Sequence, residues 1–507
     1  MASFYIPLTG LNADTTALNT IANDLSNMNT TGFKNQTVNF SDLFYDQLGS
    51  TGSGDPIQSG AGTQVANIET DFNAGTPDST GLDTDVALQG NGFFVVAGGG
   101  QQFLTRDGNF SLNSSGQLVT SNGLDVMGYS ATNGVVNTSG ELSPVTIPVG
   151  GTEPPSATTT MGMTVTLDSE GNSFSAPVTL FDSLGNSYQA SVDFSKTGTN
   201  QWSYSISVPD TLTANTSAAG GINTVNYNFG SSGGTLATVD TGTNMTITGL
   251  NAGGVSTTIS APGITAGESV SSYATALQGA LTTAGITGTV TASATGQLSI
   301  SGANITVAGS VIQDPVATNN TGTLNFNSNG NLVSPSANVS GISFAGLSDG
   351  ASSLNFSWNL FNSNGTGTIS QVDAASGVSS TAGTNGFAAG DYSGFSIGSD
   401  GTVTASFSNG QNLNVGQIAL GNVANLQGLT ANGNGDYSTT QASGASSVGV
   451  SGSAGLGTMQ DGALEASNVN ISQEFSDLII AQRAFEANSK AITTFDTITQ
   501  ETIQMIH

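Results

Sequence analysis

The residue types that most often carry catalysis are scarce in this chain. It contains no cysteine, and its single histidine, His507, is the last residue. The lack of cysteine excludes thiolate nucleophiles, disulfides and cysteine-ligated metals, and a histidine at the chain end is poorly held for a Ser-His-Asp triad. A glycine-rich phosphate loop with its lysine is also missing from the sequence. We therefore expect no enzyme and no bound cofactor.

Carboxylates alone could still bind a metal or cleave a glycosidic bond. The stretches DSEGNS (168–173) and DSLGNS (182–187) faintly resemble calcium loops, but they lack the ligand spacing and the final glutamate of an EF-hand. We interpret both as turns between strands and expect no metal site. A carboxylate pair for glycoside hydrolysis stays open, because any two of the 34 acidic residues could converge and nothing singles out a pair.

The five basic residues are more informative than the acidic ones. Lys34, Arg106, Arg483 and Lys490 lie in the first and last quarters of the chain, and only Lys196 is central. Cations this rare, in a chain with a net charge of -29, should have specific carboxylate partners. Arg483 and Lys490 are seven residues apart and share a helix face. All four outer cations are candidate charges between subunits.

The composition argues against several kinds of partner. With 34 acidic and 5 basic residues, the surface repels phosphate backbones and anionic lipids, so we expect no binding to nucleic acid. No run of about 18 apolar residues occurs, which predicts no membrane insertion. The N-terminus has neither a basic nor a continuous apolar region, so no cleaved signal peptide is expected. A hydrophobic content of 36% fits strand-rich domains better than disorder.

Both ends of the chain are predicted to be helical, because apolar residues recur there every seven positions. The first helix is expected from Leu8 to Met28, and the second from near Ile471, with Asn470 and Gln473 as a reciprocal cap. The core residues of the two helices are expected to be Leu11, Leu18, Ile21, Leu25, Met28, Ile471, Phe475, Leu478, Ile479, Phe485, Ile492 and Phe495. Two heptad patterns favour a pair of terminal helices over two separate helices that each cover a sheet.

Between the ends, short alternating runs divided by Asn-Gly and Asp-Gly turns predict strands. The fold class is therefore mainly β with α-helical termini, which pair as a coiled-coil-like core domain followed outward by successive β-rich domains inserted in one another. Within the stretch 212–321, the sequence ESVSSYATALQGALTTAGI predicts one further helix. The predicted domains are a helical core (1–30 with 462–507), an extended linker (31–75), a β-rich inner domain (76–145 with 372–461), a β-barrel-like middle domain (146–211 with 322–371) and an outer α+β insert (212–321).

Several stretches resemble one known family. LNTIANDLSNMNTTGFK (18–34) and GALEASNVNISQEFSDLIIAQRAFEANSKAITTFDTI (462–498) are similar to the terminal signatures of flagellar rod and hook proteins. VTLFDSLGNSYQASVDFSK (178–196) and the stretch 385–429 resemble hook proteins in particular. The resemblance covers about 8–196 and 386–506, whereas 212–321 departs from any shared pattern.

The resemblance implies a structural subunit that polymerises with itself into the curved tube between the flagellar rod and filament. It also implies contacts with the distal rod protein, the hook cap, the hook-filament junction protein and the flagellar export apparatus. The location would be the extracellular hook, reached through flagellar type III export without a cleaved signal. Two alternatives remain: a hook-associated or distal rod protein of the same family, and a secreted β-rich adhesin or glycan-binding protein.

Overall fold

The chain divides into two compact units. A computed structural model describes residues 4–50, 56–212, 215–219, 222–228, 231–232, 235–236, 238–239, 244–262, 268–293, 297–381 and 383–505; His507 lies outside them. The terminal unit comprises Met1–Thr152 and Asp391–His507, and the inserted unit comprises Glu153–Gly390. Strands dominate both units, and helices occupy both ends of the chain. The predicted fold class, mainly β with α-helical termini, is confirmed.

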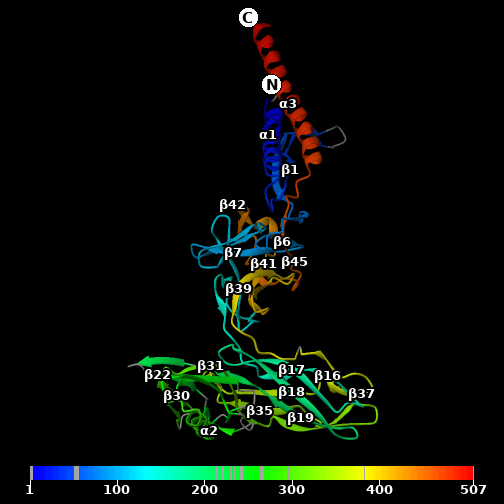
Figure 1. Cartoon of the computed structure of the whole chain (residues 1–507). Helices are drawn as coiled ribbons and strands as arrows, with labels where there is room; N and C mark the ends of the chain where they lie inside the picture. The colour runs from blue at the N-terminus through cyan, green and yellow to red at the C-terminus, as the bar shows by residue number, and fades with distance from the viewer. Residues whose placement is uncertain are drawn as a thin grey trace. The chain divides into compact units, whose positions relative to one another are not determined.

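Two long helices pair in the terminal unit. They are α1 (Tyr5–Ser26) and α3 (Ile471–Met505), which lie side by side (Figure 1). They run antiparallel, since the rings of Phe4 and Phe495 are 6.0 Å apart at one end while Ile21 clusters with Ala481 further along. Small side chains on both helices allow this close packing, and Ala17 belongs to the same buried cluster. Apolar spacing thus correctly predicted both helices, with the first shifted by a few residues.

The N-terminus of α3 is capped as predicted, but only in one direction. The Asn470 side chain accepts a hydrogen bond from the backbone N–H of Gln473, at 3.3 Å, and one from that of Ser472, at 3.1 Å. This satisfies amide groups that have no partner inside the helix. The Gln473 side chain does not return to Asn470, because it donates to the Asp477 carboxylate at 3.0 Å instead. The reciprocal half of the predicted cap is therefore wrong.

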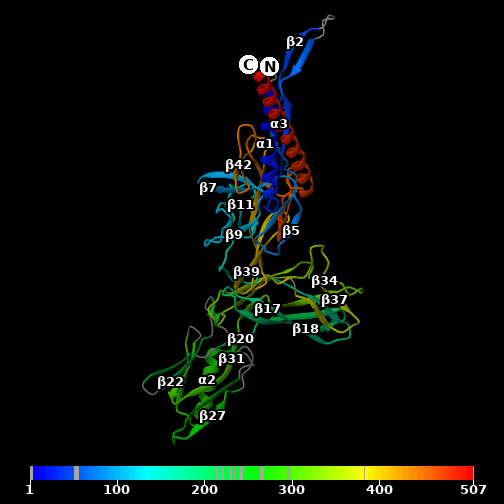
Figure 2. The same ribbon diagram turned by 90° about the horizontal axis from the view of Figure 1, so that it is seen from above.

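The segment 31–75, predicted as an extended linker, is extended but paired with itself. Its strands are β1 (Gln36–Asp42), β2 (Tyr45–Ser50), β3 (Pro56–Gly60) and β4 (Thr63–Thr70). Strand β1 pairs antiparallel with β4, and β2 with β3. Both β1 and β4 pack on α1, where Val38 joins the cluster of the two helices. Figure 2 shows the β2–β3 hairpin projecting away from that packing.

A large, mainly antiparallel sheet forms the rest of the terminal unit. Along its main path the strands are β14 (Thr152–Glu153), β39 (Gly390–Ile397), β40 (Thr402–Phe407), β41 (Asn412–Asn422), β11 (Asp125–Thr132), β7 (Phe93–Gly98), β8 (Gln101–Thr105), β43 (Asp436–Ser438) and β42 (Thr430–Gly433). Branching from it are β9 (Phe110–Leu112), β10 (Leu118–Thr120), β12 (Val135–Val136), β13 (Ser143–Pro144) and β44 (Ser447–Val450). Two short antiparallel pairs precede α3 in the chain: β6 (Val86–Gln89) pairs with β45 (Thr458–Asp461), and β5 (Pro77–Ser79) pairs with β46 (Ala463–Glu465). A 3-10 turn spans Leu426–Gly428. Alternating side chains such as Phe94, Val96 and Val126 fill the core of the large sheet.

The larger part of the inserted unit encloses one core between several sheets. A five-stranded sheet contains, in order, β17 (Ser173–Phe181), β18 (Ser187–Gly198), β19 (Gln201–Ser207), β33 (Thr321–Phe326) and β34 (Leu332–Ser334). A four-stranded sheet contains β15 (Thr160–Gly162), β36 (Leu354–Asn359), β35 (Val339–Ala345) and β32 (Val316–Thr318). A three-stranded sheet contains β37 (Ile369–Val372), β16 (Thr164–Asp168) and β38 (Gly377–Ser380). Both tryptophans of the chain, Trp202 and Trp358, are fully buried in this core. The stretches 168–173 and 182–187 connect successive strands, as their turn interpretation predicts.

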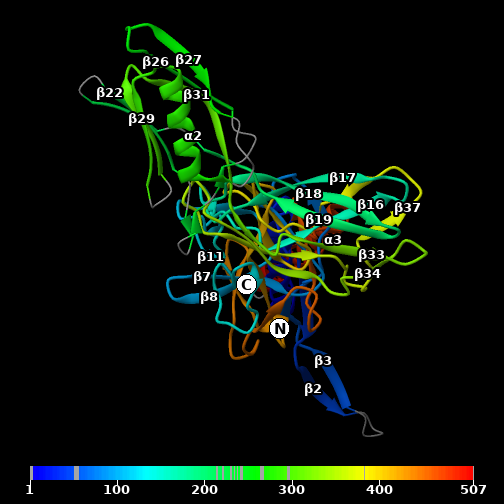
Figure 3. The ribbon, with the colours of Figure 1, turned by 60° about the horizontal axis from the view of Figure 1, so that its bottom comes forward.

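Most of the stretch 212–321 contributes to a second, α+β part of the inserted unit, whose core is a separate cluster of buried residues. Helix α2 (Val270–Thr283) packs against strands, and Figure 3 shows it lying along them. The strands are β20 (Asp210–Leu212), β21 (Asn215–Ala219), β22 (Ile222–Asn228), β23 (Ser231–Ser232), β24 (Thr235–Leu236), β25 (Thr238–Val239), β26 (Asn244–Leu250), β27 (Ser256–Ser260), β28 (Glu268–Ser269), β29 (Gly288–Ala292), β30 (Gln297–Ala303) and β31 (Thr306–Asp314). The predicted helix is confirmed, and its apolar face, including Tyr273 and Leu277, is buried.

Candidate assembly surface

The predicted core residues of the terminal helices are only partly covered by the helix pair. Ile21 is buried, whereas Leu11, Leu18, Leu25, Leu478, Phe485, Ile492 and Phe495 are half-buried. Met28, Ile471, Phe475 and Ile479 are exposed, Phe475 at 53% and Ile479 at 49%. One partner helix covers a stripe of limited width, so the rest of the seam faces outward.

Other large apolar side chains of the same region are also exposed. They are Tyr5, Ile6, Leu8, Phe40, Phe44, Tyr45, Ile68, Ile480, Ile498, Ile503 and Met505. Phe44, between β1 and β2, is 93% exposed. Single exposed apolar residues are normal on proteins, but a concentration of them on two helices and a hairpin marks a surface for another protein.

A polar contact fixes the two helices against each other. The Asn488 side-chain amide of α3 donates to the Asp14 carboxylate of α1 at 2.8 Å. Gly10 makes room for it, since a Cβ at that position would lie 2.6 Å from the Asn488 amide nitrogen. A side chain at position 10 would therefore displace the Asn488 side chain and disturb its hydrogen bond to Asp14. Neither Asp14 nor Asn488 was among the predicted site residues, because each is an ordinary polar residue in its own helix.

Two of the predicted site cations lie in a buried ion cluster inside the terminal unit. The Lys34 ammonium is 2.5 Å from one carboxylate oxygen of Glu465, and the Arg106 guanidinium is 3.2 Å from the other. Lys34 also donates to the backbone carbonyl of Asn73 at 2.8 Å, and Arg106 to that of Gly90 at 2.7 Å. Burial lowers the pKa of Lys34, although Glu465 opposes the shift.

This cluster corrects the expectation that Lys34 and Arg106 act between subunits. The side chains of Lys34, Arg106 and Glu465 are at most 3% exposed, so their charges are satisfied within the chain. The cluster ties the segment after α1 and the strand before α3 to the large sheet. The expectation of specific carboxylate partners was correct for both cations. Sequence could not identify Glu465 as the partner, because 431 residues separate it from Lys34.

A second group of titratable residues, also missed from sequence, lies where α1, α3 and β1 meet. Asp24 is fully buried; one oxygen accepts the Gln36 backbone N–H at 2.8 Å, and the other has no hydrogen-bond partner among the described residues. Burial raises the pKa of Asp24 to about 6, and nearby Glu474 adds to the shift. The pKa of Glu474 is also raised, first by burial and then by Asp477. These carboxylates are close together, with no cation within salt-bridge distance in the described part of the chain.

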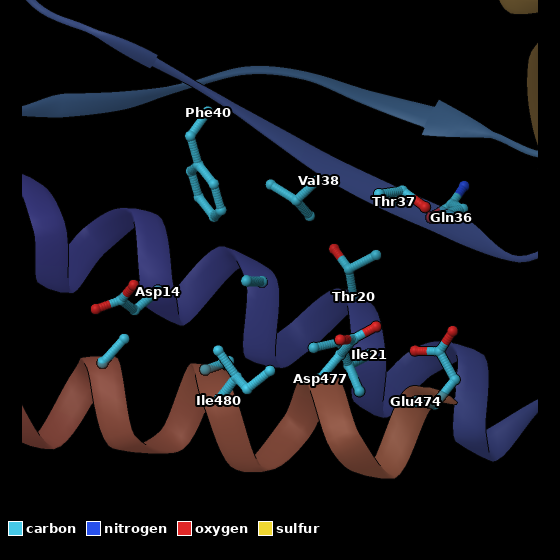
Figure 4. A pocket seen from close by; sticks show the side chains of 13 residues that line it. Asp14, Thr20, Ile21, Gln36, Thr37, Val38, Phe40, Glu474, Asp477 and Ile480 are labelled. Carbon is cyan, nitrogen blue, oxygen red and sulfur yellow. The ribbon is translucent and has the colours of Figure 1, made fainter. Parts of the chain in front are cut away.

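A groove of about 350 Å³ opens beside these carboxylates, between α1, α3 and β1 (Figure 4). We call it the helix groove. Its walls are apolar and acidic, and its lining residues are Asp14, Ala17, Thr20, Ile21, Gln36, Thr37, Val38, Phe40, Glu474, Asp477, Ile480, Ala481 and Ala484. The carboxylates of Asp14, Glu474 and Asp477 give the groove a negative charge. Such a groove suits a helix face that carries both apolar and cationic side chains.

The other two predicted site cations, Arg483 and Lys490, are exposed on α3. Neither forms an ion pair with the described residues, unlike Lys34 and Arg106. Phe475 and Ile479 lie eight and four residues before Arg483, so they share its side of the helix. The four residues Phe475, Ile479, Arg483 and Lys490 form a surface that we call the cation stripe.

Within the described ranges, no group of three or more histidine, cysteine, aspartate or glutamate residues is arranged to hold a metal ion. Among the helices described, none has the length and apolarity needed to cross a membrane.

Family models of flagellar proteins match along the chain. They are described as "Flagella basal body rod protein" (4–34), "Flagellar hook protein FlgE/F/G D1 domain" (87–172), "Flagellar basal body protein FlaE D2 domain" (148–303) and "Flagellar basal body rod FlgEFG protein C-terminal" (460–505). The flagellar hook protein FlgE of Escherichia coli (strain K12) is 30% identical over 498 residues, which cover 98% of each chain. The chain belongs to the flagellar hook protein family.

Another relative agrees with this assignment. The flagellar hook protein FlgE of Treponema pallidum (strain Nichols) is 28% identical over 516 residues, again 98% of each chain. Among solved structures, the crystal structure of Helicobacter pylori flagellar hook protein FlgE2 gives a TM-score of 0.39 at 14% identity, covering 76% of this chain and 100% of that one. The hook family places the chain in the bacterial flagellum as a structural protein, and neither an adhesin nor a rod protein is favoured.

Proposed function

We propose that this chain is the subunit that polymerises into the flagellar hook, the curved tube that joins rod to filament and transmits torque. The observation that supports this most directly is the apolar surface of α1, α3 and the β1–β4 hairpins, which the chain does not cover by itself. Fully burying one large apolar side chain contributes roughly 1.5–3 kcal/mol. A polymer in which neighbouring helix pairs cover one another would gain this contribution many times per subunit.

We further propose five domains in the predicted order, with the helical core innermost in the tube and the α+β part around α2 outermost. The second segment of the inner β-rich domain would begin near Asp391 and not at residue 372, because β38 pairs inside the inserted unit. The partners would be other copies of the chain, the distal rod protein, the hook cap, the hook-filament junction protein and the flagellar export apparatus. Export would use the flagellar type III pathway to the extracellular hook, without a cleaved signal peptide. The role is mechanical, and we propose no catalysis.

Substitutions on the exposed apolar surface test the polymer directly. The double variant Phe475→Ser with Ile479→Ser should fold normally, because both side chains are exposed, yet it should not form curved tubes after salting out, as seen by electron microscopy. The control Val135→Ser removes an apolar side chain that is 71% exposed on the large sheet, and it should leave the tubes unchanged. Tubes of normal length and number from the double variant would refute the proposal.

A further inference from the structure

The cation stripe and the helix groove occupy different sides of the same helix. At 100° per residue, Arg483 and Lys490 lie roughly 120° around α3 from the positions that line the groove, such as Asp477 and Ala484. The cations of a chain therefore point away from the carboxylates of its own groove. They remain available to a second molecule.

The two surfaces are complementary in chemistry, and the acidic lining is long enough for both cations. The stripe presents the half-exposed side chains of Phe475 and Ile479, followed by the two cations. The groove presents apolar walls with Asp14 and Asp477 among its lining. Seven residues separate the two cations, about 10 Å of helix, and the acidic lining extends from the first turn of α3 to the level of Asn488, where Asp14 is bonded. Both cations of one helix can reach the acidic lining together.

We propose that the helix groove of one copy receives the cation stripe of the next copy, with Arg483 at Asp477 and Lys490 near Asp14. This inference rests on the proposed function, and it names the contact through which the polymer grows. The surfaces are different patches of one chain, so the contact is heterologous and leaves each copy with a free groove or a free stripe. Such a contact propagates and does not stop at a closed dimer.

Charge supports a second copy as the occupant. The chain has only five basic residues against 34 acidic ones, and copies carrying a net charge of -29 repel one another. Lys34 and Arg106 are buried on Glu465, and Lys196 belongs to the inserted unit. Arg483 and Lys490 are therefore the exposed cations of the described terminal unit, on the helices with the exposed apolar surface. Their placement reduces the repulsion where the copies must meet.

Cross-linking tests the contact, because the natural chain contains no cysteine. The full-length double variant Ile479→Cys with Ala484→Cys places one thiol on the stripe and one in the groove. Five residues of helix separate them, more than a disulfide within one chain can span. After polymerisation and mild oxidation, we expect a ladder of covalent multimers. The control pair Ile479→Cys with Asn19→Cys, whose second thiol is exposed on α1 outside the groove, should give no ladder.

The outcomes separate this inference from the proposed function. Tubes without a ladder, or equal ladders from both pairs, would overturn the groove assignment and leave the hook-subunit proposal standing. If the unmodified chain forms no tubes at all, the proposed function fails, and this inference fails with it.

A charge exchange tests the same contact without cysteines. Arg483→Asp should raise the protein concentration needed for polymerisation at least about tenfold, because an acidic stripe then meets an acidic groove. The exchange Asp477→Arg with Arg483→Asp restores opposite charges between copies, so the required concentration should return to within about threefold of the original. An exchange variant that polymerises no better than Arg483→Asp would refute the pairing.

Discussion

The inserted unit and the helix pair of the terminal unit satisfy their apolar residues in opposite ways. In the inserted unit, Trp202, Trp358 and Leu324 are completely buried between sheets of the same chain. In the helix pair, Phe475 and Ile479 are about half exposed, and Ile480 is 65% exposed. The first region has what it needs to be stable alone. The second has a small internal cluster and a large uncovered surface, so much of its stability must come from other molecules.

This difference suggests a division of labour in a hook. Domains with complete cores can keep their shape while the tube bends, because their stability does not depend on their neighbours. Helices whose apolar surface is covered only in the polymer join subunits, and we expect them to be incompletely ordered in the isolated chain. The inserted units, by contrast, carry few charges. Small contacts between the inserted units of neighbouring subunits should therefore rearrange at low cost as curvature changes.

Hydrogen exchange should show the largest contrast between the two regions. In the monomer, we expect amides of α1 and α3 to exchange at least about a thousandfold faster than those of β17–β19, since local opening energies range from near zero to the global value. In the polymer, the same helical amides should become protected. Full protection of 8–28 and 471–503 in the monomer would contradict this expectation.

The ion cluster should be the most sensitive point of the terminal unit. Glu465→Gln leaves two buried cations without a countercharge, and breaking a buried ion pair in this way costs about 3–5 kcal/mol. Calorimetry of the full chain should show a lower unfolding temperature for the terminal unit. Tryptophan fluorescence identifies the other transition, since both tryptophans lie in the inserted unit. The control Glu141→Gln, at an exposed site of the same unit, should change neither transition.

The core of the inserted unit should respond to truncation without any effect on assembly. Leu324→Ala removes a fully buried side chain beside the tryptophans, and such a cavity costs about 2–5 kcal/mol. Chemical denaturation followed by tryptophan fluorescence measures the loss, and tubes should still form at low denaturant. Leu184→Ala, at a side chain that is 57% exposed, should change stability by less than about 0.5 kcal/mol. Loss of tubes in Leu324→Ala would show that the two regions are not independent.

The smallest effect should be a pH dependence of the helix pair. Burial raises the pKa of Asp24 to about 6, above its ordinary value of 3.8. Between these values the folded state binds more protons than the unfolded state, so the pair loses stability as pH rises through that window. The helical circular dichroism of the monomer should therefore increase as pH falls from about 7 to about 5.

Substituting Asp24 tests whether its carboxyl causes this pH dependence. Asp24→Asn should have more helical signal near neutral pH and a weaker pH dependence, because its side chain is never charged and can still accept from Gln36. The control Asp42→Asn, at the exposed end of β1, should keep the original pH dependence. An unchanged profile in Asp24→Asn would assign the effect to another group, with Glu474 the first candidate.

Local patterns predicted the elements of this protein well. Heptad spacing located α1 and α3, Asn470 marked where α3 begins, and helical spacing located α2 within a strand-rich stretch. These features depend on side chains within a few residues of one another, so a single sequence contains them. The reciprocal role of Gln473 failed for an equally local reason, since Asp477 one turn later competes for its amide.

The sequence by itself determined that the ends are apolar helices, that the middle is β, and that catalysis lacks its usual residues. The tertiary structure decided which charges meet. It buried Lys34 and Arg106 on Glu465, brought Asp14, Glu474 and Asp477 to one groove, and left Arg483 and Lys490 facing outward. Periodicity gives the faces of a helix but not its neighbours, because contacts across hundreds of residues depend on how the whole chain packs.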